Sequence, residues 1–143
     1  MDEYAVSVLI VDDFEEWRQL VGTALRKKLG LCIIEEVEDG LEAVQKAKGL
    51  QPDLILLDIG LPVLNGIEAA RQIRSVSPKS KVIFLTENHS CDVAQAALDT
   101  GASGYVIKSA FSHELISAVE TVLKGKQFLS AKLRALSLEP QIT

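Results

Sequence analysis

The sequence predicts an α/β protein, a doubly wound (βα)5 fold built on a five-stranded parallel sheet. Four short apolar runs rich in β-branched residues, each bounded by polar residues, glycine or proline, occupy residues 5–11, 54–57, 82–85 and 105–107. None of them alternates between apolar and polar residues, which is typical of strands buried on both faces of a parallel sheet. Segments with helical periodicity separate the runs. This alternation predicts right-handed crossovers that place helices on both faces of the sheet.

Length, composition and charge fit one globular domain. The chain has 143 residues, of which 48% are hydrophobic and 24% charged, with a formal net charge of −5. An acidic chain does not attract nucleic acid as a whole, so we expect no direct binding to it. The N-terminus lacks the basic start of a signal peptide, and no apolar stretch approaches the ~20 residues that span a bilayer. With two cysteines and no CxxC motif, the chain is expected to be cytoplasmic and without membrane contact.

The remaining elements are expected in the following order. Apolar residues recur at helical spacing over residues 14–25, and Trp17 belongs to this face, where core packing is expected. A weaker strand over residues 32–37 turns acidic, as an edge strand does. Asn65 and Ser112 are predicted to cap the third and fifth helices. After the helix over residues 14–25, the second to fifth helices are expected over residues 41–48, 65–74 and 92–100 and around residues 115–123.

Polar residues end four of the predicted strands. Asp12 and Asp13 end the first, Asp58 the third, Thr86 the fourth and Lys108 the fifth. Ligands bind outside the carboxyl ends of the strands in a doubly wound sheet, so these side chains are expected to meet at one edge. A polar residue often ends a strand simply because the chain reaches the surface, and for any one of them this is the better explanation. The combination of all of them favours a site.

Three neighbouring carboxylates repel one another unless a cation relieves the repulsion. An all-oxygen aspartate site suits Mg²⁺, which usually retains waters and a phosphate among its ligands. Lys108 could then neutralise one phosphoryl oxygen, and the Thr86 hydroxyl could donate to another. Asp58 stands alone at the centre of the predicted sheet, so we expect it to be the nucleophile that forms an aspartyl phosphate. The paired Asp12 and Asp13 are more typical of metal ligands.

The motifs "VLIVDDF", "LILLDIGLPVLNG", "VIFLT" and "GYVIK" together resemble the receiver domains of two-component response regulators. The match extends over residues ~5 to ~124 in order and spacing. It implies a flavodoxin-like sheet of strand order 2-1-3-4-5. It also implies that Asp58 accepts a phosphoryl group from the phosphohistidine of a sensor histidine kinase or a phosphotransfer protein. Asp13 would ligate Mg²⁺ directly, Asp12 would assist, and the backbone carbonyl of Gly60 would be a further ligand.

The resemblance also implies a switch. Lys108 would pair with the phosphoryl group, the Thr86 hydroxyl would be drawn towards it, and the Tyr105 ring would follow inward. One position departs from the family pattern. Receivers usually carry a proline joined by a cis bond after this lysine, and Ser109 stands there instead. A cis bond without proline costs about 3 kcal/mol, so the geometry of the loop after Lys108 is left open.

The predicted division is a receiver domain over residues 1–125 and a C-terminal extension or linker over residues 126–143. The end of the receiver region, "AVETVLKGKQFLSAKL", resembles receivers that feed a LuxR-type helix-turn-helix output domain, so control of transcription is expected. The chain is then either an excised receiver or a stand-alone one. The resemblance also allows a homodimer.

Two other functional classes stay open at this point. A haloacid-dehalogenase-like phosphatase uses the same residue types, but it places its nucleophile in a D-x-D motif, which "VDDF" lacks. A pseudo-receiver would only bind or dimerise, and the complete acid set with Lys108 argues against it. On the main hypothesis the chain is a signalling module and not an enzyme, apart from self-catalysed phosphoryl acceptance and loss.

Overall fold

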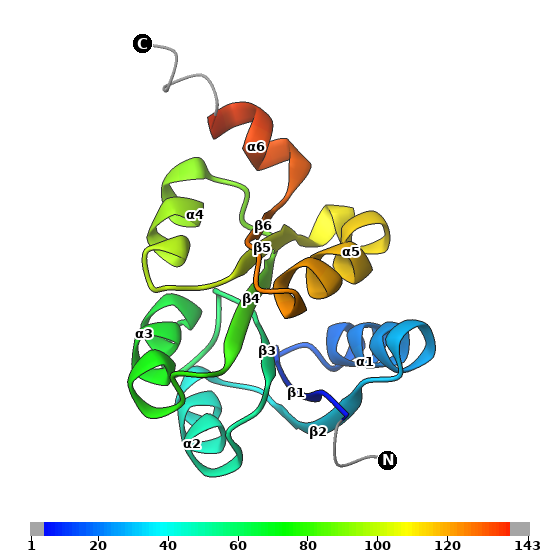
Figure 1. Ribbon diagram of the computed structural model, residues 1–143. Coiled ribbons are helices and arrows are strands. Elements are labelled where there is room, and N and C mark those ends of the chain that lie inside the picture. Colours follow the sequence, from blue (N-terminus) through cyan, green and yellow to red (C-terminus); the bar gives the residue numbers. More distant parts are fainter. Residues whose placement is uncertain (1–4, 138–143) are drawn as a thin grey trace.

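The computed structural model describes residues 5–137. Residues 1–4 of the predicted receiver domain and residues 138–143 of the predicted extension lie outside the described part. The described residues form one parallel sheet in the order β2-β1-β3-β4-β5-β6 (Figure 1). The strands are β1 (Ser7–Val11), β2 (Cys32–Val37), β3 (Leu54–Leu57), β4 (Lys81–Thr86), β5 (Gly104–Ile107) and β6 (Phe128–Leu129). The expected order 2-1-3-4-5 is confirmed, and the expected number of strands is one too few.

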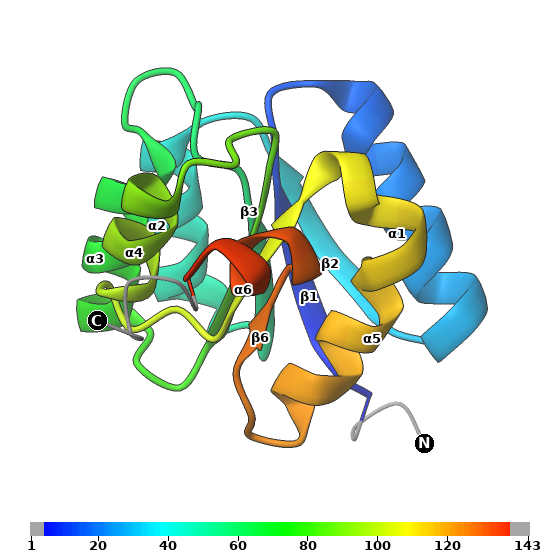
Figure 2. The same ribbon diagram turned by 90° about the horizontal axis from the view of Figure 1, so that it is seen from above.

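Helices cover both faces of this sheet. They are α1 (Glu15–Leu29), α2 (Gly40–Leu50), α3 (Gly66–Val76), α4 (Cys91–Leu98), α5 (Phe111–Leu123) and α6 (Ala131–Ser137). The pair α1 and α5 lies on one face, and α2, α3 and α4 lie on the other (Figure 2). Each face has its own buried apolar cluster. Within residues 5–137 no helix is long and apolar enough to cross a membrane.

The central strand β3 shows why the apolar runs do not alternate. All four of its residues are buried. Leu54 and Leu56 pack in the cluster under α1 and α5, whereas Ile55 and Leu57 pack in the opposite cluster. Successive side chains of a strand point to opposite faces, so a strand covered on both sides must be apolar throughout. The residue after Leu57 is the first that can be polar.

Helix starts follow the predicted signal at one position and not at another. The Asn65 side chain accepts hydrogen bonds from the Ile67 and Glu68 amides, 3.0 Å each, which confirms it as the cap of α3. The prediction for Ser112 is wrong, because α5 already begins at Phe111. The helix starts early because a 3-10 turn, η2 (Lys108–Ala110), leads directly into it.

The sixth strand comes from the segment predicted as an extension. β6 runs parallel to β5 and is followed by α6, whose Leu133 is 1% exposed. Leu133 and Leu129 pack with the cluster on the α4 side of the sheet. A strand of two residues is too short to leave a periodic pattern in the sequence, which explains why it was not predicted. The fold therefore continues past residue 125.

Candidate functional site

The ends of β1 and β3 place the first two carboxylates of the site. The two strands are parallel neighbours with Val11 opposite Leu57, so the residues that follow, Asp12 and Asp58, emerge side by side. The Asp58 amide donates a hydrogen bond to the Val11 carbonyl at 3.1 Å, which continues the sheet by one residue. The sheet register thus fixes the backbones of both acids at its carboxyl edge.

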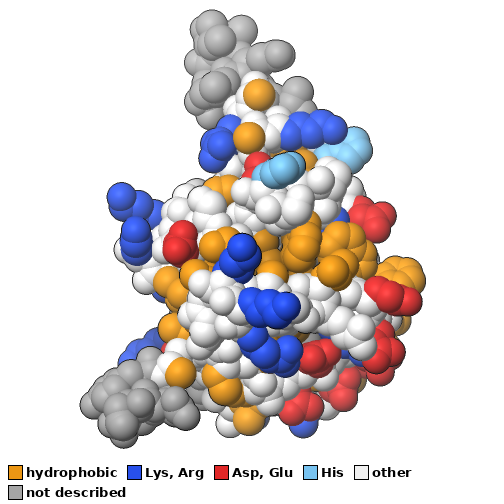
Figure 3. Space-filling view, turned by 90° about the vertical axis from the view of Figure 1, so that its right-hand side faces the viewer, with side chains coloured by type: hydrophobic (Ala, Val, Ile, Leu, Met, Phe, Trp, Pro, Cys, Tyr) orange, Lys and Arg blue, Asp and Glu red, His pale blue; other side chains and the backbone are white. Residues whose placement is uncertain are grey.

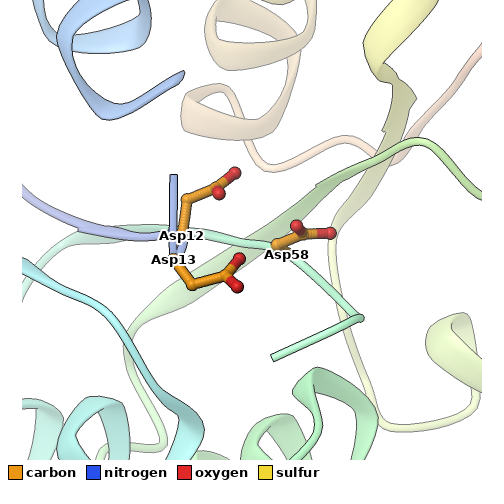
Figure 4. A group of neighbouring side chains, drawn as sticks. All are labelled: Asp12, Asp13 and Asp58. Atoms are coloured by element: carbon orange, nitrogen blue, oxygen red, sulfur yellow. The ribbon is translucent and has the colours of Figure 1, made fainter. Parts of the chain in front are cut away.

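Asp13 completes a cluster of three carboxylates (Figure 4). One oxygen from each of Asp12, Asp13 and Asp58 can be chosen so that all three atoms lie within 4.8 Å of one another. Asp12 and Asp58 are 4% and 8% exposed, whereas Asp13 is open to solvent. The structure thus brings these acids together at one edge of the sheet, as the sequence predicted. The cluster offers three oxygens to one small cation, with access from the Asp13 side.

Lys108 follows β5 and brings a buried cation to the same cluster. Its Nζ lies 2.8 Å from Asp12 Oδ2 and 3.2 Å from Asp58 Oδ2. The Lys108 side chain is only 3% exposed. A single ammonium therefore bridges two carboxylates in an environment where charge interactions are stronger than at the surface.

Burial and neighbouring charges have opposite effects on the pKa values of Asp12 and Lys108. Burial raises the pKa of the Asp12 carboxyl, although hydrogen bonds from Lys108 and from the Phe14 amide oppose that shift. Burial alone would lower the pKa of the Lys108 ammonium, but its hydrogen bond to Asp12 and the charge of Asp58 raise that pKa overall. Lys108 thus keeps its proton firmly, as a permanent counter-charge at the edge of the sheet must.

Thr86 and Tyr105 are connected through the loop after β4. The Thr86 hydroxyl accepts a hydrogen bond from the Asn88 amide at 3.3 Å, and the Tyr105 hydroxyl donates to the Asn88 carbonyl at 2.8 Å. Tyr105 is fully buried, and its ring already lies inside the fold. Burial, aided by the charge of Asp58, raises the pKa of its phenol to about 12. The backbone of Asn88 therefore joins the two residues that were predicted to act as a switch.

The loop after Asp58 leads closely back to the site. The Gly66 amide donates to the Ile59 carbonyl at 2.7 Å, and a Cβ on Gly66 would lie 1.9 Å from the Asp58 carbonyl oxygen. Only glycine allows the start of α3 to approach the backbone of Asp58 this closely. Gly60 lies in this loop, two residues after Asp58, and its role as a metal ligand stays a prediction.

Two features around Lys108 could be learned only from the structure. They are the geometry of its bond to Ser109 and its contact with Trp17. No peptide bond in the described residues is cis, so the bond between Lys108 and Ser109 is trans. Trp17, expected to serve core packing, also places its ring 4.8 Å from Lys108 Nζ. These residues are far apart in sequence, and no local pattern could have indicated that they meet.

The comparisons with known proteins decide the family. The family model of the response regulator receiver domain matches residues 8–120. This chain belongs to the response regulator receiver domains. The receiver is similar to a LuxR-family two-component response regulator from Aurantimonas sp., with a TM-score of 0.91, 29% identity and coverage of 97% of this chain and 99% of that one.

Curated relatives of the receiver are named as regulators. The transcriptional regulatory protein LnrK of Bacillus subtilis is 36% identical over 133 residues, which is 93% of this chain and 60% of that protein. The response regulator UvrY of Escherichia coli is 31% identical over 142 residues, covering 96% and 65%. The receiver thus spans about three fifths of the length of the curated relatives it matches.

Membership of this family narrows the functional classes. Receiver domains are signalling modules of systems in which response regulators pair with histidine kinases, and relatives of this chain are named as transcriptional regulators. The haloacid-dehalogenase-like alternative is accordingly not favoured. The predicted resemblance to LuxR-type regulators is confirmed.

Proposed function

We propose that the receiver accepts a phosphoryl group on Asp58 and that this modification switches a protein-interaction face. The observation that carries the proposal is the arrangement of Asp12, Asp13 and Asp58 around the buried Lys108. The donor is a phosphohistidine on a sensor histidine kinase or a phosphotransfer protein. A carboxylate oxygen of Asp58 attacks phosphorus while the phosphorus–nitrogen bond breaks. The bonding electrons leave with the imidazole nitrogen, which takes up a proton.

The side chains around Asp58 have separate tasks in this transfer. Lys108 exchanges part of its contact with Asp58 for a phosphoryl oxygen, so its charge stabilises the charge that builds up there. The Thr86 hydroxyl donates to another phosphoryl oxygen. Lys108 enters the transfer as a charged ammonium, because its hydrogen bond to Asp12 and the charge of Asp58 raise its pKa. Acceptance and hydrolytic loss of the group are catalysed by the receiver's own residues.

The carboxylate cluster fits Mg²⁺. Three oxygens within 4.8 Å of one another match the small, all-oxygen shell that this ion prefers. Asp13 is exposed and has no described contact with Lys108. It is therefore the best placed of the three to bind directly, with Asp12, Asp58 and the Gly60 carbonyl as further ligands. The ion, when bound, supplies positive charge to the phosphoryl oxygens.

A switch of the predicted kind needs a second arrangement of Thr86 and Tyr105. Their shared partner Asn88 would follow the Thr86 hydroxyl when it turns towards the phosphoryl group, which would shift the loop before α4. The surface around α4 and α5, between which β6 covers the edge of β5, would then be presented in a changed form to a partner or to a second copy. In a longer protein an attached output domain would turn this change into control of transcription.

The experiment uses Mg²⁺ with acetyl phosphate and intact-mass analysis. The wild-type protein should gain the mass of one phosphoryl group, and Asp58→Asn should gain none. Asp53→Asn is the matched control, because Asp53 immediately precedes β3 and its carboxylate accepts hydrogen bonds from Ser7 at the opposite edge of the sheet. The proposal would be contradicted by a wild-type protein that stays unmodified, or by an Asp58→Asn variant that is modified at position 58. The first result would favour a pseudo-receiver.

A further inference from the structure

The ammonium of Lys108 has a third neighbour besides its two carboxylates. Its Nζ lies 4.8 Å from the centre of the Trp17 ring. A cation over an indole face is attracted by the ring's electrons, and the attraction is larger when the cation is shielded from water. The Lys108 side chain is 3% exposed, so this contact belongs to the shielded kind.

A second aromatic ring holds Trp17 in place. The ring of Phe111 meets the Trp17 ring edge to face, with centroids 5.5 Å apart and planes at 82°. This contact joins α1 to α5, the two helices that form the face where hydrophobic side chains gather in Figure 3. The indole is therefore fixed from a direction other than that of the lysine.

The turn after β5 explains why one ring meets both residues. Lys108 begins the 3-10 turn η2, and Phe111 is the residue directly after it. Side chains three residues apart in such a turn lie on the same side. Lys108 and Phe111 accordingly face Trp17 together. Ser109, which replaces the family's usual proline, is the second residue of this turn, so this departure lies between the two residues that contact Trp17.

The carboxylates alone do not fix Lys108 during the reaction. Asp12 and Asp58 both take new partners when a cation and a phosphoryl group are present, and a lysine side chain has considerable rotamer entropy to regain. We propose that Trp17 is a positioning residue that keeps the Lys108 ammonium at the site while its carboxylate partners change. This role rests on the proposed function, because it concerns the lysine that receives the phosphoryl group.

The first test compares two replacements of the ring. Trp17→Leu should slow the modification of Asp58 by acetyl phosphate and Mg²⁺ by ~10-fold, because the attraction to the cation is lost. Trp17→Phe, which keeps an aromatic face, should stay within about threefold of the wild type. Val21→Ala is the matched control for lost packing, since Val21 is buried on the same helix and has no described contact with the ammonium. Equal slowing by all three variants would overturn the proposal.

The second test asks whether the effect passes through Lys108. In a Lys108→Gln background, adding Trp17→Leu should cause no further slowing. The same slowing with and without the lysine would show that Trp17 acts only through packing, and the proposal would be wrong. The comparison of Trp17→Phe with Trp17→Leu does not depend on this background, so it decides the matter even where Lys108→Gln fails to fold.

A third measurement is independent of phosphorylation. The wild type, Trp17→Leu, Lys108→Gln and the variant that carries both substitutions form a double-mutant cycle, and their unfolding constants are measured in denaturant. We expect the loss of the ring to raise the unfolding constant several-fold more when Lys108 is present. Additive effects would contradict the contact itself. A wild-type protein that takes no phosphoryl group would disprove the proposed function but leave this coupling measurable.

Discussion

Lys108 joins two carboxylates that would otherwise repel each other at the edge of the sheet. Its ammonium bridges them at distances of 2.8 Å to Asp12 and 3.2 Å to Asp58. The charge excess of the site is thereby reduced, and the exposed Asp13 is left to attract an ion. At the scale of single residues, the site combines a nucleophile, a counter-charge and a metal ligand with different degrees of burial.

The buried phenol of Tyr105 is expected to lower the free energy of unfolding as the pH becomes alkaline. Its phenol has a pKa of about 12 in the folded protein, whereas the unfolded chain releases this proton near pH 10. The contribution of the Tyr105 phenol to the free energy of unfolding is fully present below pH 10. It is lost as the pH rises towards 12, because in this range the phenol has released its proton in the unfolded chain and not in the folded protein. Tyr105→Phe lacks this dependence.

We expect the stability advantage of the wild type over Tyr105→Phe to fall by up to about 2 kcal/mol across this range. Denaturant midpoints of both proteins at neutral and alkaline pH would measure the difference. Parallel pH curves for the two proteins would contradict the burial of an unionised phenol. Comparing the two proteins at each pH removes the contribution of the lysines, which titrate in both.

The close approach of α3 to the backbone of Asp58 makes one glycine indispensable. A Cβ on Gly66 would lie 1.9 Å from the Asp58 carbonyl oxygen, so Gly66→Ala must displace either α3 or the end of β3. We expect a loss of at least about 2 kcal/mol in the free energy of unfolding, measured by denaturant titration. Gly49→Ala is the control, since open space surrounds that glycine in α2. It should be neutral or gain up to about 1 kcal/mol.

At the scale of elements, Glu114 of α5 fastens α6 to the fold. One of its carboxylate oxygens accepts a hydrogen bond from the Ser130 hydroxyl, and the other accepts one from the Ala131 amide at 2.9 Å. The Ser130 hydroxyl in turn accepts from the Ile107 amide at 2.9 Å, one residue before Lys108. The segment after α5 is therefore hydrogen-bonded directly to β5, the strand that leads into Lys108.

Removal of the Glu114 carboxylate should loosen α6 without unfolding the domain. Glu114→Ala leaves the first amide of α6 and the Ser130 hydroxyl without this partner, which should cost about 1 kcal/mol. Hydrogen exchange should become faster at Ala131 and Leu133, while the amides of β3 keep their protection. Glu120→Ala, on an exposed position of the same helix, is the control. Unchanged exchange in α6 would show that its other contacts, among them the burial of Leu133 and the packing of Arg134 over the Phe128 ring, are enough to hold it.

The sequence predicted elements where the pattern was long and local, and missed contacts made by distant residues. The run that ends on Asp58 indicated a buried strand because four consecutive apolar residues need cover on both faces. The meeting of Asp12, Asp58 and Lys108 followed from the parallel order of the strands. The Trp17 contact and β6 were not predictable in this way, because one depends on how α1 packs and the other on a pair of residues with no periodicity.

At the scale of the whole molecule, one sheet separates two apolar layers and gathers the polar groups at one edge. The α1 and α5 layer carries the aromatic contact to Lys108, and the opposite layer carries the close approach of α3. Both layers therefore reach the site from opposite sides. Substitutions in either can alter the site through the shared sheet.

The sixth strand also covers the edge of β5, which could otherwise pair with a strand of another molecule. Beyond β5, the Phe128 and Ser130 amides donate to the Ser103 and Tyr105 carbonyls at 3.0 Å and 2.9 Å, and the Ser130 hydroxyl accepts from Ile107. A chain cut after residue 125 would leave this row of backbone groups without partners. Exposed strand edges of this kind pair with strands of other molecules.

We therefore expect a protein of residues 1–125 to self-associate with rising concentration in light scattering, while a protein of residues 1–137 stays at constant mass over the same range. A shortened protein that shows no more association than the longer one would contradict this. If the shortened protein associates as expected, the segment formed by β6, Ser130 and α6 is what keeps the outer edge of β5 from becoming a template for aggregation.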